Sequence, residues 1–150
     1  MIKNLVFRPI TESDLSDVYQ IENSVHYSPW QASSFKPCFT GKNHGWLVFD
    51  GSVLCAYMIF SMVADEAEIL NMSVASDYQG KGVGSALLEF SIEKIRVSCE
   101  NIFLEVRESN NAAIALYEKY YFCEVGRRNN YYPAKRGRED ALIYALALNV

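Results

Sequence analysis

Apolar and polar residues follow two different periods along this chain, and the two periods predict strands and helices in turn. Runs typical of strands occupy residues 5–10, 45–63, 67–74, 101–106, 122–128 and 141–148. The run 45–63 is interrupted by Asp50-Gly51, a dipeptide typical of a two-residue hairpin turn. It therefore predicts two strands, which brings the expected number to about seven.

Apolar residues at helical spacing predict two longer helices, over residues 84–95 and 110–120. One face of the first carries Gly84, Leu87, Leu88, Ser91, Ile92 and Ile95, and one face of the second carries Ala113, Leu116, Tyr117 and Tyr120. An earlier helix is predicted after Thr11, because Asp14 follows three residues later in the manner of a capping box. The residues at helical spacing along one face of this helix are Leu15, Val18, Tyr19 and Glu22. Ser28-Pro29-Trp30 predicts the start of a further short helix, with Ser28 as its N-cap.

The order of these elements predicts an α/β fold, a mixed sheet with helices on both faces. The chain has 150 residues, half of them hydrophobic, so we expect one domain over residues 1–150 with a full-sized core. No apolar run reaches the roughly 18–20 residues that would span a bilayer, and residues 1–5 lead directly into the first strand. We expect a cytoplasmic protein with no membrane partner.

Charge and cysteine content narrow the possible partners. The net charge of −4 and a pI near 5.2 argue against direct binding of nucleic acid and would suit a basic peptide or protein. The four cysteines are scattered without a Cys-x-x-Cys pair or neighbouring histidines. We therefore expect buried free thiols, with neither a metal site nor a disulfide framework.

A glycine-rich segment, Gln79-Gly80-Lys81-Gly82-Val83-Gly84, lies between the strand 67–74 and the following helix. Glycines let the backbone turn sharply, and the N-terminus of a helix directs unpaired N–H groups into that turn, so the segment predicts a phosphate site. The spacing fits neither a nucleotide-triphosphate loop, which needs Lys-Ser or Lys-Thr after its last glycine, nor a dinucleotide fingerprint. An ordinary strand-to-helix turn is the alternative.

The pattern Gln-x-x-Gly-x-Gly resembles the pyrophosphate loop of the GCN5-related N-acetyltransferase (GNAT) family, which binds acetyl-coenzyme A. Further segments resemble its ribosomal-protein-alanine acetyltransferases, in the right order and over nearly the whole chain. They are Pro29-Trp30, Leu104-Glu105-Val106-Arg107-Glu108-Ser109-Asn110, Ala113 to Glu118, Asn129-Asn130-Tyr131-Tyr132-Pro133 and Arg138-Glu139-Asp140-Ala141. The resemblance implies a mostly antiparallel GNAT sheet.

The resemblance implies transfer of acetyl from acetyl-coenzyme A, as cosubstrate, to the N-terminal alanine of a basic ribosomal small-subunit protein. At pH 7, freeing a proton from an α-amine of pKa about 7.8 costs about 1.1 kcal/mol, against about 4.6 for a lysine at about 10.4. A single glutamate could therefore suffice for an α-amine. Two alternatives remain: a lysine or small-molecule acetyltransferase, and a non-catalytic acyl-coenzyme A binding protein.

The resemblance and the residues together indicate how the cosubstrate is held. The pyrophosphate would be bound mainly through backbone N–H groups of Gln79, Gly80, Lys81, Gly82, Val83, Gly84 and Ser85. By resemblance, the backbone of Met72, Ser73 and Val74 pairs with the pantetheine arm as an added strand would. Asn110 is a further cofactor contact, or the N-cap of helix 110–120, or both.

Two residues are candidates for proton transfer. Glu105 is the candidate general base, because Ile102, Leu104 and Val106 beside it are apolar and burial raises the pKa of a carboxyl group. An exposed acidic residue on a half-buried strand is the alternative. Tyr117, also a cofactor contact by resemblance, is the candidate acid that protonates the departing thiolate. On spacing alone it would be a core aromatic, and both roles are compatible.

Aromatic residues are candidates for binding the substrate. Tyr131 and Tyr132, on the segment expected to link the last two strands, could hold the first residues of the peptide, or could serve packing. Trp30 could form the opposite wall, or cover the core. His26 and His44 are assigned no role. The late basic residues are expected to form a solvated loop, with a basic contact to coenzyme A as the alternative; they are Arg127, Arg128, Lys135, Arg136 and Arg138.

Tyr121 occupies a position where the GNAT family usually has glycine as a left-handed helix cap. A residue with a side chain costs about 1 kcal/mol in that conformation. Either Tyr121 adopts the strained geometry or the helix ends in another way.

Overall fold

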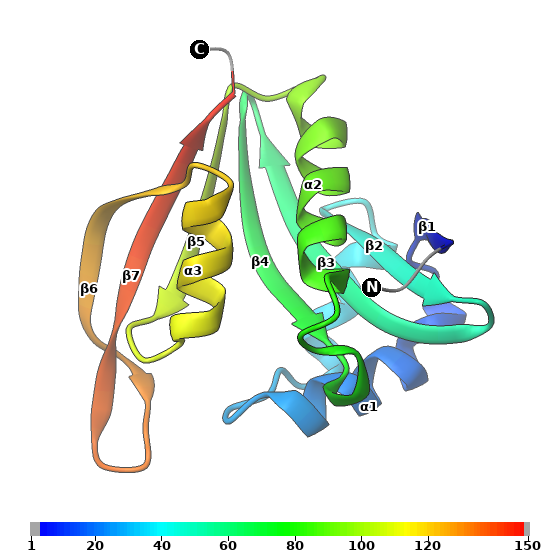
Figure 1. Ribbon diagram of the computed structural model, residues 1–150, viewed down its shortest axis with the longest axis horizontal. Coiled ribbons are helices and arrows are strands. Elements are labelled where there is room, and N and C mark those ends of the chain that lie inside the picture. The colour runs from blue at the N-terminus through cyan, green and yellow to red at the C-terminus, as the bar shows by residue number, and fades with distance from the viewer. Residues whose placement is uncertain (1–3, 149–150) are drawn as a thin grey trace. The chain divides into compact units, whose positions relative to one another are not determined.

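Seven strands form one mixed sheet in the order β1-β2-β3-β4-β5-β7-β6 in the computed structural model, which describes residues 4–148. The strands are β1 (Leu5–Pro9), β2 (Asn43–Asp50), β3 (Val53–Val63), β4 (Glu66–Val74), β5 (Asn101–Arg107), β6 (Cys123–Pro133) and β7 (Arg138–Ala147). The α-helices are α1 (Leu15–Val25), α2 (Val83–Arg96) and α3 (Asn111–Lys119) (Figure 1). Short 3-10 helices span Glu12–Asp14, Ala32–Phe39 and Ser76–Tyr78.

Strand directions make the sheet mostly antiparallel. The pairs β1–β2, β2–β3, β5–β7 and β6–β7 are antiparallel, whereas β4 and β5 run parallel from Glu66↔Asn101 to Ile69↔Leu104. The parallel pair needs a crossover connection, and α2 lies within it. The predicted α/β fold with a mixed sheet is confirmed.

The chain forms two compact units. The first unit contains residues up to Ser61 and from Leu70 to Ile92, and the second contains Met62–Ile69 and the residues from Glu93 onward. Strands β3 and β4 and helix α2 each contribute to both units. A single domain over residues 1–150 stays a prediction.

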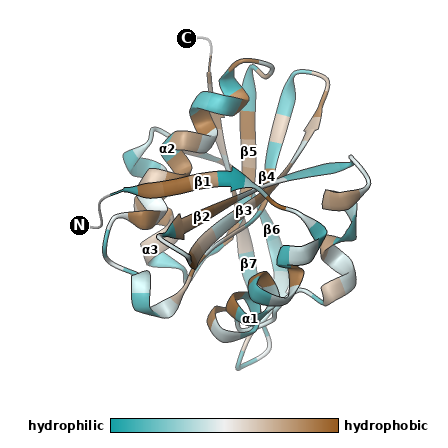
Figure 2. Ribbon diagram, turned by 90° about the vertical axis from the view of Figure 1, so that its right-hand side faces the viewer, coloured by the Kyte–Doolittle hydropathy of each residue, from teal (hydrophilic) through white to brown (hydrophobic). Residues whose placement is uncertain are grey.

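Helices cover both faces of the strands in the first unit. Val18 and Ile21 of α1 belong to one buried cluster with Leu47 of β2 and Tyr57 of β3. Residues next to each other in a strand point to opposite faces, so Trp46 lies on the other face. There its ring contacts Phe90 of α2 in an edge-on arrangement with centroids 4.8 Å apart. Figure 2 shows the apolar character of β1 and β2 and the mixed surface of α1.

Helix α3 covers one face of β5 and β7 in the second unit (Figure 1). Ile102, Leu104 and Val106 are buried on β5, and Tyr144 of β7 lies opposite Leu104. The Tyr144 hydroxyl donates a hydrogen bond to Glu118 of α3 at 3.0 Å. The apolar face of β5 therefore faces α3, and the alternate residues, Glu105 among them, lie on the other face.

The start of the first helix follows the predicted capping pattern. The Thr11 backbone N–H donates to the Asp14 carboxylate at 2.8 Å, and both terminal nitrogens of Arg8 donate to the same carboxylate at 2.8 and 2.7 Å. The first turn, Glu12–Asp14, is a 3-10 helix that continues into α1. The ion pair with Arg8 was not part of the prediction, because the pairing register of β1 and β2 decides where Arg8 points.

Three predicted boundaries were wrong. The hairpin forms, but Asp50 pairs with Val53, so the two loop residues are Gly51 and Ser52. The short helix begins at Ala32 with Gln31 as its N-cap, and it is a 3-10 helix, so Ser28 is not an N-cap. Strand β6 extends to Pro133, which places the two consecutive tyrosines in a strand rather than in a linking segment.

Among residues 4–148, no helix is both long enough and apolar enough to cross a membrane.

Candidate active site

The glycine-rich segment has the geometry of an anion-binding turn at a helix N-terminus. Gly80 and Gly82 have positive φ values of 74° and 86°, in the region that favours glycine. The first helical hydrogen bond of α2 runs from the Ala86 N–H to the Gly82 carbonyl at 3.0 Å. The N–H groups of Val83, Gly84 and Ser85 precede it and have no acceptor within the helix. Gly84 lies inside α2 rather than in the turn.

These features fit the diphosphate of coenzyme A. Backbone N–H groups and the positive end of a helix dipole stabilise bound phosphate oxygens. Gln79 at the start of the turn is fixed by its own side chain, whose amide donates to the Val74 carbonyl at 3.0 Å. The turn is therefore tied to the end of β4, where the pantetheine contacts are expected.

Residues 72–74 form the last part of β4. Ser73 is 4% exposed, whereas Met72 and Val74 are half-buried. The Ser73 hydroxyl donates to the Asn71 side chain at 3.1 Å and lies 2.5 Å from Nε2 of His26. The side chain of Ser73 is thus engaged in the interior, and its backbone is the part that can serve a ligand. Sequence reasoning had assigned no role to His26.

A buried carboxylate, Glu22 on α1, joins three other segments of the first unit. It accepts hydrogen bonds from the Tyr57 hydroxyl at 2.5 Å, the Asn71 amide at 2.7 Å and the Trp30 backbone N–H at 2.8 Å. Burial and the bond to Glu22 raise the pKa of Tyr57. Sequence reasoning missed this network. Its signal was one glutamate on an otherwise apolar helical stripe.

Trp30 is fixed by that network through its backbone and by packing through its ring. The ring is half-buried, with its centroid 5.0 Å from that of Phe35 in the core of the first unit. It covers the core, which was one of the two predicted roles. The other role, a wall for the substrate, stays a prediction.

Glu105 is held on β5 with its side chain 17% exposed. The sequence-based reason for that burial was wrong, because Ile102, Leu104 and Val106 lie on the opposite face of the strand. The carboxylate has charged neighbours instead. Nε of Arg128 on β6 lies 2.9 Å from Oε1 of Glu105.

A second carboxylate, Glu68 of β4, lies near Glu105. The Glu68 side chain as a whole is exposed. Partial burial of its carboxyl group and the negative charge of Glu105 nevertheless raise the pKa of Glu68, while Arg128 acts in the opposite direction. Sequence reasoning missed both Glu68 and Arg128, since their proximity depends on strand pairing.

Tyr117 lies on the inner side of α3 and is 8% exposed. Its ring packs against Phe122, with centroids 5.6 Å apart. Burial, and then the nearby Tyr132 hydroxyl, raise the pKa of Tyr117 to about 12. The phenol therefore keeps its proton at neutral pH, as a proton donor must.

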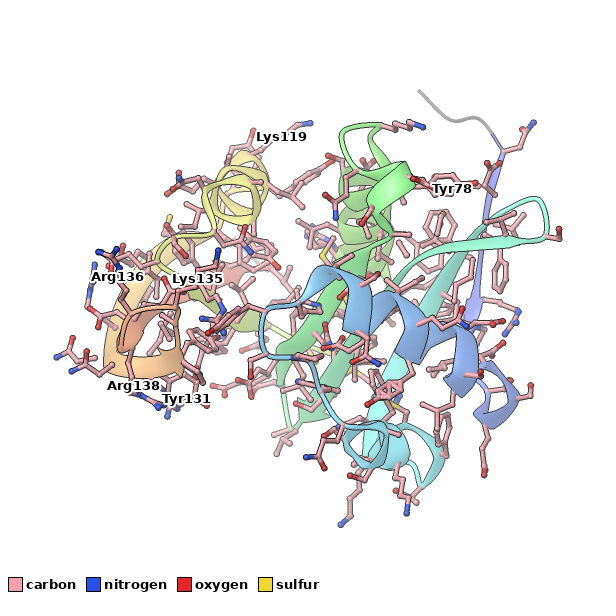
Figure 3. The ribbon with its side chains drawn as sticks, turned by 90° about the horizontal axis from the view of Figure 1, so that it is seen from below. Tyr78, Lys119, Tyr131, Lys135, Arg136 and Arg138 are labelled. Carbon is pink, nitrogen blue, oxygen red and sulfur yellow. The ribbon has the colours of Figure 1, made fainter. Side chains whose placement is uncertain are left out.

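Tyr131 and Tyr132 lie near the end of β6, with ring centroids 5.0 Å apart. Tyr131 is 45% exposed, and Figure 3 shows it beside Arg138 on the β6–β7 hairpin. Tyr132 is half-buried beneath the guanidinium of Arg107. Burial and the charge of Glu105 raise the pKa of Tyr132 to about 12. Tyr132 is thus electrostatically linked to both Glu105 and Tyr117.

The segment Arg138-Glu139-Asp140 holds these tyrosines in place. Between Arg128↔Ala141 and Tyr132↔Glu139 the register shifts, so β6 bulges. Within the bulge, Asn130 has a φ of 54° and its N–H donates to Asp140 at 2.8 Å. Arg138 donates to the carbonyls of Asn130 and Tyr131, each at 2.8 Å.

Asn110 caps α3. Its side-chain oxygen accepts a hydrogen bond from the Ala113 N–H at 3.2 Å, which confirms the predicted N-cap. Its further role as a cofactor contact stays a prediction.

The cysteines are all free. Cys55 and Cys99 are buried as predicted, Cys38 is half-buried, and Cys123 is exposed, contrary to prediction. Burial raises the pKa of Cys38 and of Cys55 to about 11, so neither is an activated thiolate at neutral pH. In the part of the chain that the structure describes, no group of histidine, cysteine or acidic side chains is arranged to hold a metal ion.

Comparison with known proteins identifies the family of the chain. The family model of the acetyltransferase (GNAT) family matches residues 15–122. The chain belongs to the GNAT acetyltransferase family. Members of this family use acetyl-coenzyme A.

Individual GNAT proteins resemble the chain over almost its full length. It is 40% identical over 139 residues to the [ribosomal protein bS18]-alanine N-acetyltransferase of Escherichia coli K12, covering 92% of this chain and 94% of that protein. It is 37% identical over 145 residues to the Salmonella typhimurium LT2 protein of the same name, covering 94% and 96%.

Solved GNAT structures share the fold. The crystal structure of the Escherichia coli ribosomal-protein-S18-alanine N-acetyltransferase superimposes with a TM-score of 0.93 at 37% identity, covering 98% of this chain and 96% of that one. Arabidopsis thaliana NAA60 in complex with acetyl-CoA gives a TM-score of 0.89 at 22% identity, covering 98% and 100%, and supports the fold alone.

Proposed function

We propose that the protein transfers the acetyl group of acetyl-coenzyme A to the N-terminal α-amine of a protein, namely the N-terminal alanine of a ribosomal small-subunit protein. The observation that carries this proposal is the similarity to bS18-alanine N-acetyltransferases over 92–94% of the chain. Of the segments that suggested this group from sequence, all but Pro29-Trp30 lie in the second unit, which contains Glu105.

The first unit binds the cosubstrate. Residues Gln79 to Ser85 present backbone N–H groups to the diphosphate, with Gly80 and Gly82 allowing its close approach. The backbone of Met72, Ser73 and Val74 pairs with the pantetheine arm, and Asn110 stays a predicted cofactor contact. When bound, acetyl-coenzyme A supplies an acyl carbon that is activated by the thioester.

The second unit supplies the proton transfers. Glu105 removes a proton from the substrate's α-ammonium group, directly or through water, and the neutral amine attacks the thioester carbon. A carbon–nitrogen bond forms, the carbon–sulfur bond breaks, and Tyr117 donates its proton to the departing sulfur. The acylated nitrogen then loses its second proton to give the neutral amide, and that proton, carried by water, restores the phenol of Tyr117. A weak base is sufficient for an α-amine, because the pKa of the α-ammonium group, about 7.8, lies close to neutral pH.

The hairpin aromatics bind the substrate's first residues. Tyr131 is exposed on the bulge of β6, and Tyr132 lies beside the charges of Glu105 and Arg107. Trp30 is a further proposed substrate contact. The partner is a basic protein N-terminus; a direct nucleic-acid contact is not part of the proposal, and the cytoplasmic location stays a prediction.

The test is to identify the acetylated atom. A purified ribosomal protein with a free N-terminal alanine is incubated with acetyl-coenzyme A and the enzyme, and the product is digested and sequenced by mass spectrometry. We expect the acetyl group on the N-terminal peptide alone. Acetyl groups on internal lysines, with the N-terminus unmodified, would refute the proposed specificity.

A further inference from the structure

The ion pair between Arg128 and Glu105 joins an exposed side chain to a largely buried one. The Glu105 side chain is 17% exposed and that of Arg128 is 54% exposed. Arg128 also lies over the ring of Tyr131, with its guanidinium carbon 5.2 Å from the ring centroid. The arginine therefore reaches inward from the surface, along an aromatic residue, to the carboxylate of the proposed base.

Strand pairing explains how Arg128 reaches Glu105 across β7. On one face, Glu105, Ile143 and Gly126 lie in a row, and Arg107, Ala141 and Arg128 form the next row. Ala141 offers only a methyl group between the two arginines. The Arg128 side chain can therefore extend over β7 towards the carboxylate.

We propose that Arg128 is a positioning residue that holds the Glu105 carboxylate in place and oriented until the substrate's amine reaches it. The inference rests on the proposed function, because it concerns the base of that reaction. A carboxylate has two oxygens and accepts several hydrogen bonds, so it can bind the guanidinium and an amine together. Arg128 acts through Glu105 and forms no bond with the acetyl group.

The charges around Glu105 in the second unit explain why such a residue is needed. Glu68 faces it from β4, Arg128 and Tyr132 face it from β6, Arg107 follows two residues later on β5, and β7 contributes the apolar Ile143. The like charges of Glu68 and Glu105 repel each other, whereas Arg128 attracts the Glu105 carboxylate at 2.9 Å. Without Arg128, no positive charge would hold the Glu105 carboxylate at this place on the face of the sheet.

The test is the pH dependence of kcat/KM for an N-terminal alanine peptide between pH 5 and 9. Removing a positive charge beside a carboxylate makes that carboxylate harder to ionise, by roughly one pH unit or more. On the acidic side of the pH profile, kcat/KM falls as the pH decreases. Arg128→Gln should move this acid limb to higher pH by about one unit, and Arg128→Lys should restore most of the native profile. Glu68→Gln should move the limb in the opposite direction.

Arg127→Gln is the matched control. Arg127 is the neighbouring arginine, paired with Asp140 at 2.7 Å and Glu108 at 3.2 Å rather than with Glu105. Its replacement should leave the acid limb in place. Because every variant acts on the same peptide, the titration of the peptide's own amine contributes equally to all the profiles.

A second readout does not depend on turnover. The carboxyl carbons of 13C-labelled glutamates are titrated by NMR, and the Glu105 signal is assigned by its loss in Glu105→Gln. We expect its titration midpoint to rise in Arg128→Gln. An unmoved midpoint and an unmoved acid limb would overturn the role of Arg128, even if the native enzyme acetylates the peptide. Absence of native turnover would count against the proposed function instead.

Discussion

Tyr117 combines a packing role with the proposed role of general acid. Its ring fills space against Phe122, and burial raises its pKa to about 12, so it stays protonated over the whole range in which the enzyme can be assayed. Because the folded-state pKa is raised, deprotonation should contribute no basic limb to the pH profile below about pH 10.

Tyr117→Phe should lower kcat by about 100-fold or more, the usual contribution of a general acid, with little change in KM for acetyl-coenzyme A. Steady-state kinetics with a free alanine peptide would measure both. Tyr144→Phe is the matched control, since it removes another buried hydroxyl, one bonded to Glu118, away from the proposed chemistry. Equal losses of kcat in the two variants would contradict the assignment of Tyr117 as the acid.

Tyr121 adopts the left-handed geometry, which was one of the two alternatives left open by the sequence. Its φ is 73°, and the N–H groups of Tyr121 and Phe122 donate to the carbonyls of Glu118 and Tyr117, the pattern of a Schellman cap. The side chain is 83% exposed, so little packing offsets the strain.

Tyr121→Gly should therefore stabilise the protein by up to about 1 kcal/mol, which corresponds to about 2–4 °C in Tm for a chain of this size. Differential scanning calorimetry would measure it. Tyr121→Ala should give no comparable gain, because alanine keeps the Cβ atom that makes the left-handed conformation unfavourable. A lower Tm for the glycine variant would show that the cap is not strained.

Residue-scale prediction succeeded where the local chain decides the geometry. The cap at Tyr121 and the N-cap at Asn110 each depend on a few neighbouring residues. Arg128 could not be assigned, because its contact with Glu105 depends on a bulge and on the order in which three strands pair. Glu22 was equally hidden, since its donors come from segments up to 49 positions away in the sequence.

At the scale of elements, the start of α1 depends on an ion pair that the capping pattern does not reveal. The hydrogen bond from Arg8, assisted by that from Thr11, lowers the pKa of Asp14 well below its usual range, although partial burial opposes this. A carboxyl group whose pKa is depressed in the folded state contributes stability above its unfolded pKa, and the contribution is lost as the pH falls through the folded value.

Asp14→Asn should therefore destabilise the protein at neutral pH. The difference in unfolding free energy between native and variant should stay constant above about pH 5 and shrink as the pH falls below about 4. Urea unfolding at a series of pH values would measure it, and Arg8→Gln should show the same narrowing. If the difference in unfolding free energy between native protein and variant stayed the same from about pH 6 to about pH 3, the role of the ion pair would be contradicted.

The bulge of β6 is the element that presents Tyr131. Asp140 secures it by accepting hydrogen bonds from the Asn130 N–H and from Arg127. Asp140→Ala should raise KM for the peptide, by up to about 100-fold if the aromatic shifts by an ångström, and leave KM for acetyl-coenzyme A unchanged. Arg136→Ala, at the exposed tip of the same hairpin, is the control. A rise in both KM values for Asp140→Ala would indicate a general loss of structure instead.

Alternation and helical spacing predicted the existence of every strand and of α1, α2 and α3. The sequence wrongly predicted a helix beginning at Ser28. No local pattern shows that the Trp30 N–H donates a hydrogen bond to Glu22 instead of belonging to a helix. Alternation also ended β6 too early. The second half of that strand is polar on both faces and bulged, so it has no period of two.

For the whole molecule, motif order was more informative than composition. The acidic net charge only suggested a basic partner, whereas the glycine turn, the segment around Glu105 and the Arg138-Glu139-Asp140 segment together identified the family that the comparisons confirm. The turn has the backbone geometry of an anion site, and the Arg138 segment secures the bulge. The charges around Glu105 follow from strand pairing and required the structure.

Acetyl transfer to two short basic peptides would test the proposed activity in a single experiment. One peptide has a free N-terminal alanine, and the other has a blocked N-terminus and a single internal lysine. Native enzyme and Glu105→Gln are compared, with coenzyme A binding to each variant measured as the control for folding. We expect turnover on the alanine peptide alone, with a fall of about 100-fold or more in the variant. Turnover confined to the lysine peptide, or full activity of Glu105→Gln, would contradict the proposed reaction.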